Sequence, residues 1–193
     1  MANVSEKFGL RPYRKLDGTP LAGAQNRYTI ASGYTSAIFQ GELVEPLGTG
    51  NIQRHGPNTS DAVIGVFNGC FYTDPTTQKP TFKNYYPGGV AASDIVAYVI
   101  DAPDTVFEIN TDESFVVADL FANYSVTDTT GSTKTGISYA QLDVENSGTA
   151  GTFAVQAIDI TQNPDNNDLT VSNVGVLVRI NNHFYRQSGT GKS

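Results

Sequence analysis

IVAYVIDAPDTVFEIN, residues 95–110, is the stretch that decides the fold class. Two runs rich in β-branched and aromatic residues, which favour strands, flank a four-residue segment of turn type. In that segment Pro103 supplies the turn dihedral, and the two aspartates can accept hydrogen bonds from nearby backbone amides. We therefore predict strands over residues 95–100 and 105–110 that pair with each other across the turn.

The same pattern of short apolar runs and turn residues continues in both directions, with 19 Gly and 9 Pro in 193 residues. Further strands are predicted over residues 27–31, 37–44, 62–67, 153–160 and 174–180, with a tight turn at Asn68-Gly69 before Cys70-Phe71-Tyr72 and one helical turn within residues 115–123. A chain of this length can bury one sizeable core, so we expect one domain. About ten short strands joined by close turns predict an all-β fold, a single-domain β-sandwich or a partly closed β-barrel.

The two ends of the chain lack this pattern. Gly, Pro and Asn follow one another quickly through residues 1–26, so neither helical nor strand periodicity persists there. We predict an extended N-terminal arm over residues 1–26, a single β domain over residues 27–188 and a flexible C-terminal tail over residues 189–193.

Composition and charge exclude several classes of protein. A single cysteine, Cys70, cannot close an intrachain disulfide, which disfavours a disulfide-framed secreted module. No apolar run approaches a signal-peptide core or the roughly 20 residues of a membrane span, so we expect synthesis in a reducing cytoplasm and no membrane partner. The net charge is −7; residues 1–27 hold five bases against two acids, which leaves −10 for the rest. Such an acidic body repels phosphates, so we expect no nucleic-acid partner.

Side chains with catalytic potential are few and scattered. His55 and His183, the only histidines, have no Cys or carboxylate at metal-ligand spacing, and Cys70 follows a buried run, as a small core residue does. The ten acids of residues 94–145 could include a pair for glycoside hydrolysis, but Trp is absent, and a solvated acidic surface explains them better. We therefore expect no enzyme, no cofactor and no metal.

Five segments carry a family resemblance and occur in the same order as in that family. They are Phe8-Gly9-Leu10-Arg11-Pro12, Gly41-Glu42-Leu43-Val44, Val63-Ile64-Gly65-Val66-Phe67, Asp101-Ala102-Pro103-Asp104-Thr105-Val106-Phe107-Glu108-Ile109 and Leu177-Val178-Arg179-Ile180-Asn181-Asn182-His183-Phe184-Tyr185. Together they span nearly the whole chain, which thereby resembles the small capsid decoration, or cement, proteins of tailed bacteriophages. The resemblance implies a β-rich virion protein, commonly a homotrimer, that sits on the capsid exterior and bridges neighbouring copies of the major capsid protein.

Two groups of residues are candidates for partner contacts. In the arm, apolar side chains can bury area on the capsid or on a neighbouring subunit while basic ones pair with acids there: Phe8, Leu10, Arg11, Tyr13, Arg14 and Lys15. An arm that packs on its own body is the competing possibility. The long connection over residues 73–89 is a second candidate interface, with Phe82, Tyr85 and Tyr86. An alternative function is a head-fibre or tail-fibre domain that binds host glycans through Tyr85 and Tyr86.

Overall fold

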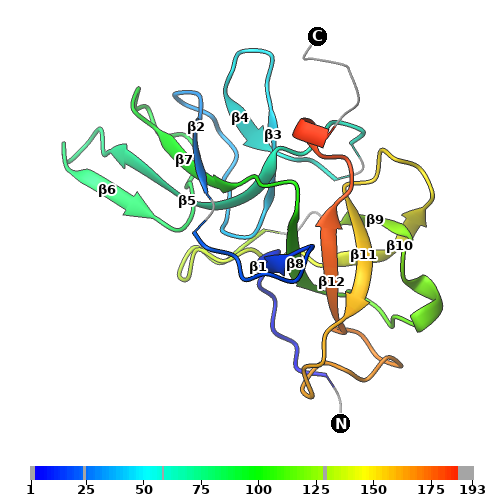
Figure 1. Cartoon of the computed structure of the whole chain (residues 1–193). Coiled ribbons are helices and arrows are strands. Elements are labelled where there is room, and N and C mark those ends of the chain that lie inside the picture. The colour runs from blue at the N-terminus through cyan, green and yellow to red at the C-terminus, as the bar shows by residue number, and fades with distance from the viewer. Residues whose placement is uncertain (1–2, 24, 58, 128–129, 187–193) are drawn as a thin grey trace.

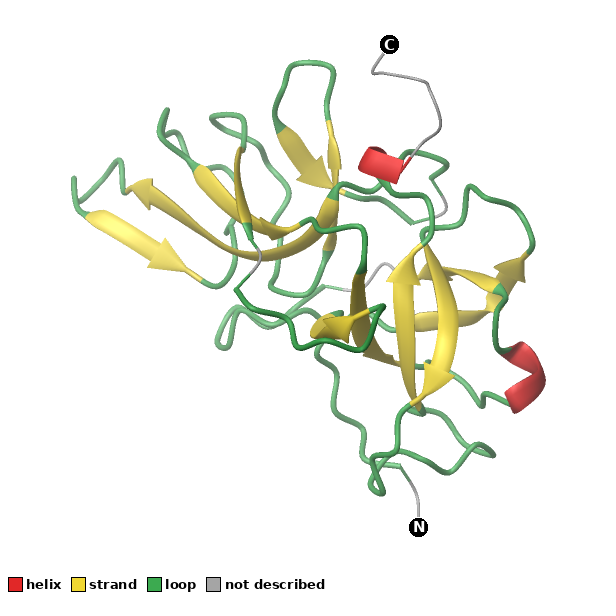
Figure 2. Ribbon diagram, in the orientation of Figure 1, coloured by secondary structure: helices red, strands yellow, loops and turns green. Residues whose placement is uncertain are grey.

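The computed structural model describes residues 3–23, 25–57, 59–127 and 130–186. These residues form twelve strands and two short 3₁₀ turns. The strands make two antiparallel sheets in a sandwich-like arrangement that does not close into a barrel (Figures 1 and 2). The all-β prediction is thus confirmed, and of its two forms the sandwich is the one observed.

Sheet 1 has the strand order β1-β8-β12-β11-β9-β10. Its strands are β1 (Arg11–Lys15), β8 (Thr105–Asn110), β12 (Gly175–Ile180), β11 (Val155–Ile160), β9 (Asn123–Val126) and β10 (Leu142–Gly148). The central strands β8 and β12 are buried over almost every residue.

Sheet 2 has the strand order β2-β7-β5-β3-β4, and β6 pairs with the end of the long strand β5. Its strands are β2 (Asn26–Thr29), β7 (Val96–Ile100), β5 (Gly65–Thr73), β3 (Leu43–Pro46), β4 (Ile52–Arg54) and β6 (Pro80–Lys83). One parallel bridge, between Ile30 and Ile52, links its two edges at a single point. The sheet therefore curls around a core of its own.

Two hydrophobic cores lie side by side. The first is formed by the inner face of sheet 1 together with Leu43, Val66 and Ile100, which project from one end of sheet 2. The second lies on the opposite face of sheet 2 and includes Phe67 and Val99. Sheet 1 thus covers only one end of one face of sheet 2.

The two strands of residues 95–110 form as predicted, but they do not pair with each other. Strand β7 pairs with β2 and β5 in sheet 2, whereas β8 pairs with β1 and β12 in sheet 1. The turn that joins them is present, with the Thr105 amide donating to the Ala102 carbonyl, and it carries the chain from one sheet to the other. The predicted pairing is wrong because hydrogen bonds hold Asp101, at the start of this turn, against β2. Nδ2 of Asn26 donates to Oδ1 of Asp101 at 3.0 Å, and the Tyr28 hydroxyl donates to Oδ2 at 2.5 Å.

The tight turn predicted at Asn68-Gly69 is also absent. Strand β5 continues through Asn68-Gly69 without a chain reversal, and its pairing register with β7 shifts between Phe67 and Gly69. Gly69 takes a φ of +135°, a conformation that favours glycine, so the turn signal in the sequence marks a β-bulge instead.

The predicted helical turn in residues 115–123 is present as η1 (Val117–Asp119). A second 3₁₀ turn, η2 (Phe184–Arg186), follows β12. The flexible tail predicted for residues 189–193 lies outside the described residues.

Candidate partner-binding surface

One end of sheet 2 presents an uncovered face. Side chains alternate along β7, so Ile100, Tyr98 and Val96 share a face. Ile100 enters the first core, whereas Tyr98 and Val96 lie farther along the strand, beyond the reach of sheet 1, and are half-buried. The strands at this end are β6, β5, β7 and β2, which extend away from sheet 1 in Figure 1.

Aromatic side chains run across this face from one strand to the next. Phe82 of β6 is 61% exposed, and its ring lies 5.9 Å from that of Tyr98, centroid to centroid, at an angle of 50°. The Arg27 guanidinium of β2 lies 6.0 Å from the Tyr98 ring. Phe71 of β5 is directly opposite Phe82 in the pairing register. We call Arg27, Phe71, Phe82 and Tyr98 the aromatic strip.

The bulge in β5 makes the aromatic strip continuous. Gly69 is the register partner of Tyr98, and a Cβ atom at this position would lie 3.2 Å from Cζ of Phe82. The Phe82 ring therefore reaches toward Tyr98 through the space that the missing side chain leaves. Sequence reasoning selected Phe82 but missed Arg27, Phe71 and Tyr98, for which alternation along the strands was the only available signal.

The loop predicted over residues 73–89 is partly a strand, and its three aromatic residues have different surroundings. β6 occupies part of it, and Phe82 points outward as expected. Tyr85 stacks on Phe39 with a centroid distance of 5.3 Å. Tyr86 is fully buried, and its hydroxyl donates to the Tyr34 carbonyl at 2.8 Å, so Tyr86 cannot be an interface residue.

The segment predicted as a free arm lies against the two sheets. Leu10 is 1% exposed and belongs to the first core, so it cannot contact a partner. Its amide donates to the Gly41 carbonyl at 2.9 Å, and a Cβ on Gly9 would come within 2.6 Å of that oxygen. Only a glycine pair allows this approach. The expectation that residues 1–26 lack regular structure is wrong for Arg11–Lys15, where β1 forms.

The basic residues of β1 have partners within the chain. Arg11 forms an ion pair with the buried carboxylate of Glu108 at 2.6 Å, and Lys15 pairs with Asp104 at 3.1 Å. Arg14 donates to the carbonyl of Lys15. The sequence led us to expect that these bases pair with acids on a partner. Two of them pair instead with acids of the same chain, Glu108 and Asp104.

Tyr13 is an exposed residue of β1. The register between β1 and β8 shifts between Pro12 and Arg14, which makes Tyr13 the extra residue of a bulge, and it is 54% exposed. Bulges commonly re-aim a side chain, and a proline with a bulge also protects an edge strand from pairing with a foreign strand. β1 therefore presents a tyrosine side chain, flanked by bases, rather than a free backbone edge.

The partly exposed aromatic ring of Phe8 completes this region. The Arg11 guanidinium lies 4.4 Å from the centroid of the Phe8 ring, so the cation that pairs with Glu108 also covers this ring. Of the six predicted arm contacts, Tyr13 and Arg11 are exposed, and Leu10 is excluded.

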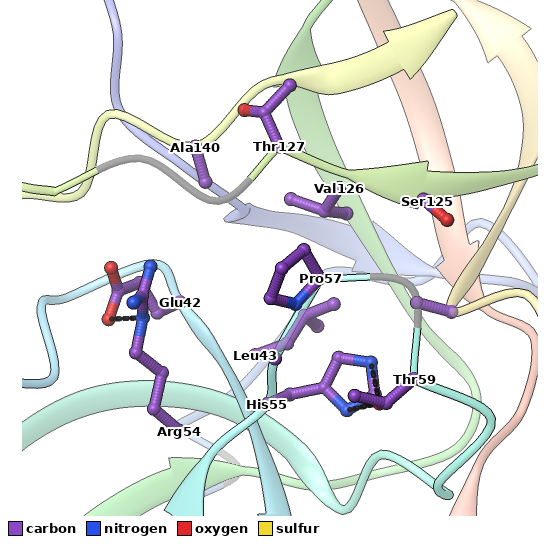
Figure 3. A pocket seen from close by; sticks show the side chains of 12 residues that line it. Glu42, Leu43, Arg54, His55, Pro57, Thr59, Ser125, Val126, Thr127 and Ala140 are labelled. Atoms are coloured by element: carbon purple, nitrogen blue, oxygen red, sulfur yellow. Dashed lines mark hydrogen bonds and ion pairs between the residues drawn. The ribbon is translucent and has the colours of Figure 1, made fainter. Parts of the chain in front are cut away.

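His55 lies in a tight pocket between β4 and β9 (Figure 3). Its Nδ1 is 2.6 Å from Oε2 of Glu45, whose Oε1 accepts a hydrogen bond from Gln53 at 2.6 Å. Burial raises the pKa of Glu45, but the hydrogen bonds from His55 and Gln53 lower it below its ordinary value. The remaining cavity is about 30 Å³, which holds one or two waters and no substrate.

The hydroxyl beside His55 does not complete a catalytic triad. Oγ1 of Thr59 lies 3.3 Å from Nδ1 and 3.4 Å from Nε2, so it sits nearly equidistant from the two ring nitrogens. A nucleophile in a triad is hydrogen-bonded to the nitrogen opposite the carboxylate partner. The contacts of His55 with Glu45 and Thr59 instead hold the loop after β4 in place.

His183 and Cys70 are buried, and neither is placed for catalysis. Nδ1 of His183 accepts a hydrogen bond from the Tyr185 amide, and burial lowers the pKa of the imidazole. Burial raises the pKa of the Cys70 thiol to about 12, so the reactive thiolate is scarce. Within residues 3–23, 25–57, 59–127 and 130–186, no three His, Cys, Asp or Glu side chains gather as metal ligands.

Comparisons of the chain with family models, with curated proteins and with solved structures give no match. In the described part of the chain, neither 3₁₀ turn is long enough to cross a bilayer, and no other helix is present. The candidate site therefore rests on the geometry alone. That geometry offers two surfaces suited to a partner, the aromatic strip on sheet 2 and Tyr13 with its basic neighbours on sheet 1.

Proposed function

We propose that this chain is a non-enzymatic structural protein of a bacteriophage virion, which binds the outer surface of the assembled capsid and bridges neighbouring major capsid proteins. The observation that carries the proposal is the uncovered end of sheet 2, where the aromatic strip lies on the face that sheet 1 covers elsewhere. The proposal also draws on the family resemblance of the sequence.

The composition of the aromatic strip favours a protein partner. Tyr, Phe and Arg are enriched in protein interfaces, and Tyr and Arg are frequent among the residues that carry most of the binding energy. The exposed Phe82 ring and the guanidinium of Arg27 lie on either side of Tyr98. A partner that covered Tyr98 would bury the two rings and could pair a carboxylate with Arg27.

A bridging function needs a second contact. Tyr13, with Arg14 and Lys15, belongs to the edge of the other sheet, so one copy can contact two neighbours at once. A protein that binds only the assembled lattice stabilises it by mass action, because shell opening must then release the bound copies. The family resemblance leads us to propose a homotrimer as the form that occupies the lattice.

The test uses capsids assembled from the major capsid protein of the phage that encodes this chain. We expect the wild-type protein to cosediment with these capsids and to appear as added density on their outer surface in a cryo-EM map. The double variant Phe82→Ser, Tyr98→Ser should lose at least tenfold in affinity. Tyr139→Ser, which alters an exposed aromatic outside the strip, is the matched control and should bind normally. No cosedimentation of the wild-type protein would overturn the proposal.

Glycan binding by a fibre domain is the second candidate, and the tilted rings of Phe82 and Tyr98 favour it because sugars stack on such rings. The site then differs from the predicted one, since Tyr86 is buried. Binding of the isolated wild-type protein on a glycan array, lost in the same double variant and accompanied by no affinity for capsids, would select this function.

A further inference from the structure

A second apolar surface lies at the opposite end of the molecule from the aromatic strip. Val116, Val117 and Phe121 are 51%, 64% and 72% exposed and surround the turn η1. Figure 2 shows η1 on the side of sheet 1 that is remote from sheet 2. Contiguous exposed apolar side chains of this kind mark interaction sites. We call these three residues the Phe121 knob.

The backbone at Phe121 is held in an unfavourable conformation. Its φ is +70°, in the left-handed region that bulky side chains rarely adopt. Two hydrogen bonds fix it there: the Phe121 amide donates to the Ala157 carbonyl at 3.0 Å, and Nε2 of Gln156 donates to the Phe121 carbonyl at 3.1 Å. Strain persists where surrounding structure enforces it and is common at functional positions. Here it directs an aromatic ring outward.

The surface near the N-terminus offers a complementary depression. A groove of about 200 Å³ runs between residues 6–12 and the start of β5. Its lining is largely apolar, and the accessible apolar residues are Phe8, Pro12 and Ile137. Pockets for drug-sized ligands are larger, about 300–1,000 Å³. The size and lining suit one inserted apolar side chain rather than a cofactor.

Charge also favours a match between the two features. The sequence over residues 112–122 holds three acids, Asp112, Glu113 and Asp119, and no base. The groove lies under the N-terminal segment, where residues 1–27 hold five bases against two acids; Arg11 in its wall already pairs with Glu108, and Lys7 and Glu6 are both exposed nearby. Opposite charges of this kind steer association and fix orientation.

We propose that the Phe121 knob of one copy inserts into the N-terminal groove of a second copy. The place of this contact in a capsid-bound assembly rests on the proposed function. The contact itself forms between two copies of the chain without a capsid. Knob and groove are different surfaces of one chain, so the contact is heterologous and repeats head to tail, and it closes into a ring or continues as a chain.

Disulfide trapping tests which surfaces meet. Ala118→Cys adds a thiol to η1, and Glu6→Cys adds one at the mouth of the groove; the native Cys70 is buried and unreactive. Under mild oxidation, a mixture of the two variants should give a disulfide-linked dimer that neither variant gives alone. Gln162→Cys, an exposed position outside both features, replaces Glu6→Cys in the control mixture, which should stay monomeric on a denaturing gel. Equal dimer yield from Ala118→Cys alone would show a symmetric contact and overturn the proposal.

Solution mass provides the second readout. We expect light scattering to show a wild-type oligomer that dissociates on dilution, and Phe121→Ser to shift its dissociation midpoint at least tenfold toward higher concentration. Phe121→Gly, which accepts the φ of this position, should have the same effect and guards against misfolding as the cause. Tyr185→Ser, which removes an exposed aromatic outside the knob and the groove, should leave the mass unchanged. A wild-type protein that stays monomeric at high micromolar concentration, or a Phe121→Ser protein that associates like the wild type, overturns the proposal.

Discussion

The rings of Phe82 and Tyr98 lie 5.9 Å apart although strand β5 separates the strands that carry them. The contact exists because Gly69 of β5 has no side chain to fill the space between them. Three neighbouring strands therefore contribute to one aromatic surface.

Gly69→Ala should lower the free energy of unfolding by about 1–3 kcal/mol, because alanine strains the φ of +135° and its Cβ would crowd Phe82 and the Lys83 carbonyl. Urea denaturation measures the change. Gly48→Ala is the control, since a Cβ there meets nothing within 4 Å, and it should change stability by less than about 0.5 kcal/mol. Equal stability of the two variants would contradict the role given to Gly69.

Phe121→Gly should raise the free energy of unfolding by about 1 kcal/mol, because it relieves a left-handed backbone while removing a side chain that is mostly exposed. Ala118→Gly, in the adjacent turn, should instead lower it by roughly 0.5–1 kcal/mol through the entropy of the unfolded chain. The same denaturation experiment compares the two. A loss of stability in Phe121→Gly would mean that the ring packs on its own chain.

Leu10→Ala should lower the free energy of unfolding by about 2–5 kcal/mol, since Leu10 lies in the first core at 1% exposure. Tyr13→Ala, three residues away and 54% exposed, should cost less than about 0.5 kcal/mol. For the same reason, deletion of residues 1–16 should destabilise the domain, because it also removes β1. A truncated protein with wild-type thermal stability would restore the free-arm model.

The stability of the protein should fall as the pH drops below about 6.5, in part through His183. Burial lowers the pKa of this imidazole in the folded state, so the unfolded chain binds the proton first. The loss of stability is therefore absent above the pKa of the imidazole in the unfolded chain. It grows as the pH falls toward the lower pKa of the folded state. Thermal melts of wild type and His183→Gln between pH 7.5 and 5.5 measure the difference in slope. The variant should show the shallower slope, whatever its stability at pH 7.5, and an unchanged slope would refute the assignment.

Exposure was the part of the candidate site that the sequence predicted least well. Phe82 and Tyr13 face outward as expected, but Leu10 and Tyr86 are buried, although each is as apolar or aromatic as its exposed neighbours. The type of a side chain fixes how much area it can bury. Which side chain is buried depends on the segments that fold over it, and these come from distant parts of the chain.

The sequence by itself determined the all-β class and the approximate positions of β2, β5, β7, β8, β11 and β12, since alternation and turn chemistry act between residues that are close along the chain. It also marked Gly69 as a special backbone position. Only the tertiary structure decided that β7 and β8 belong to different sheets, that Gly69 forms a bulge, and that one end of sheet 2 stays uncovered. Those outcomes depend on hydrogen bonds such as Asn26 to Asp101 and on packing between remote segments, which no local pattern encodes.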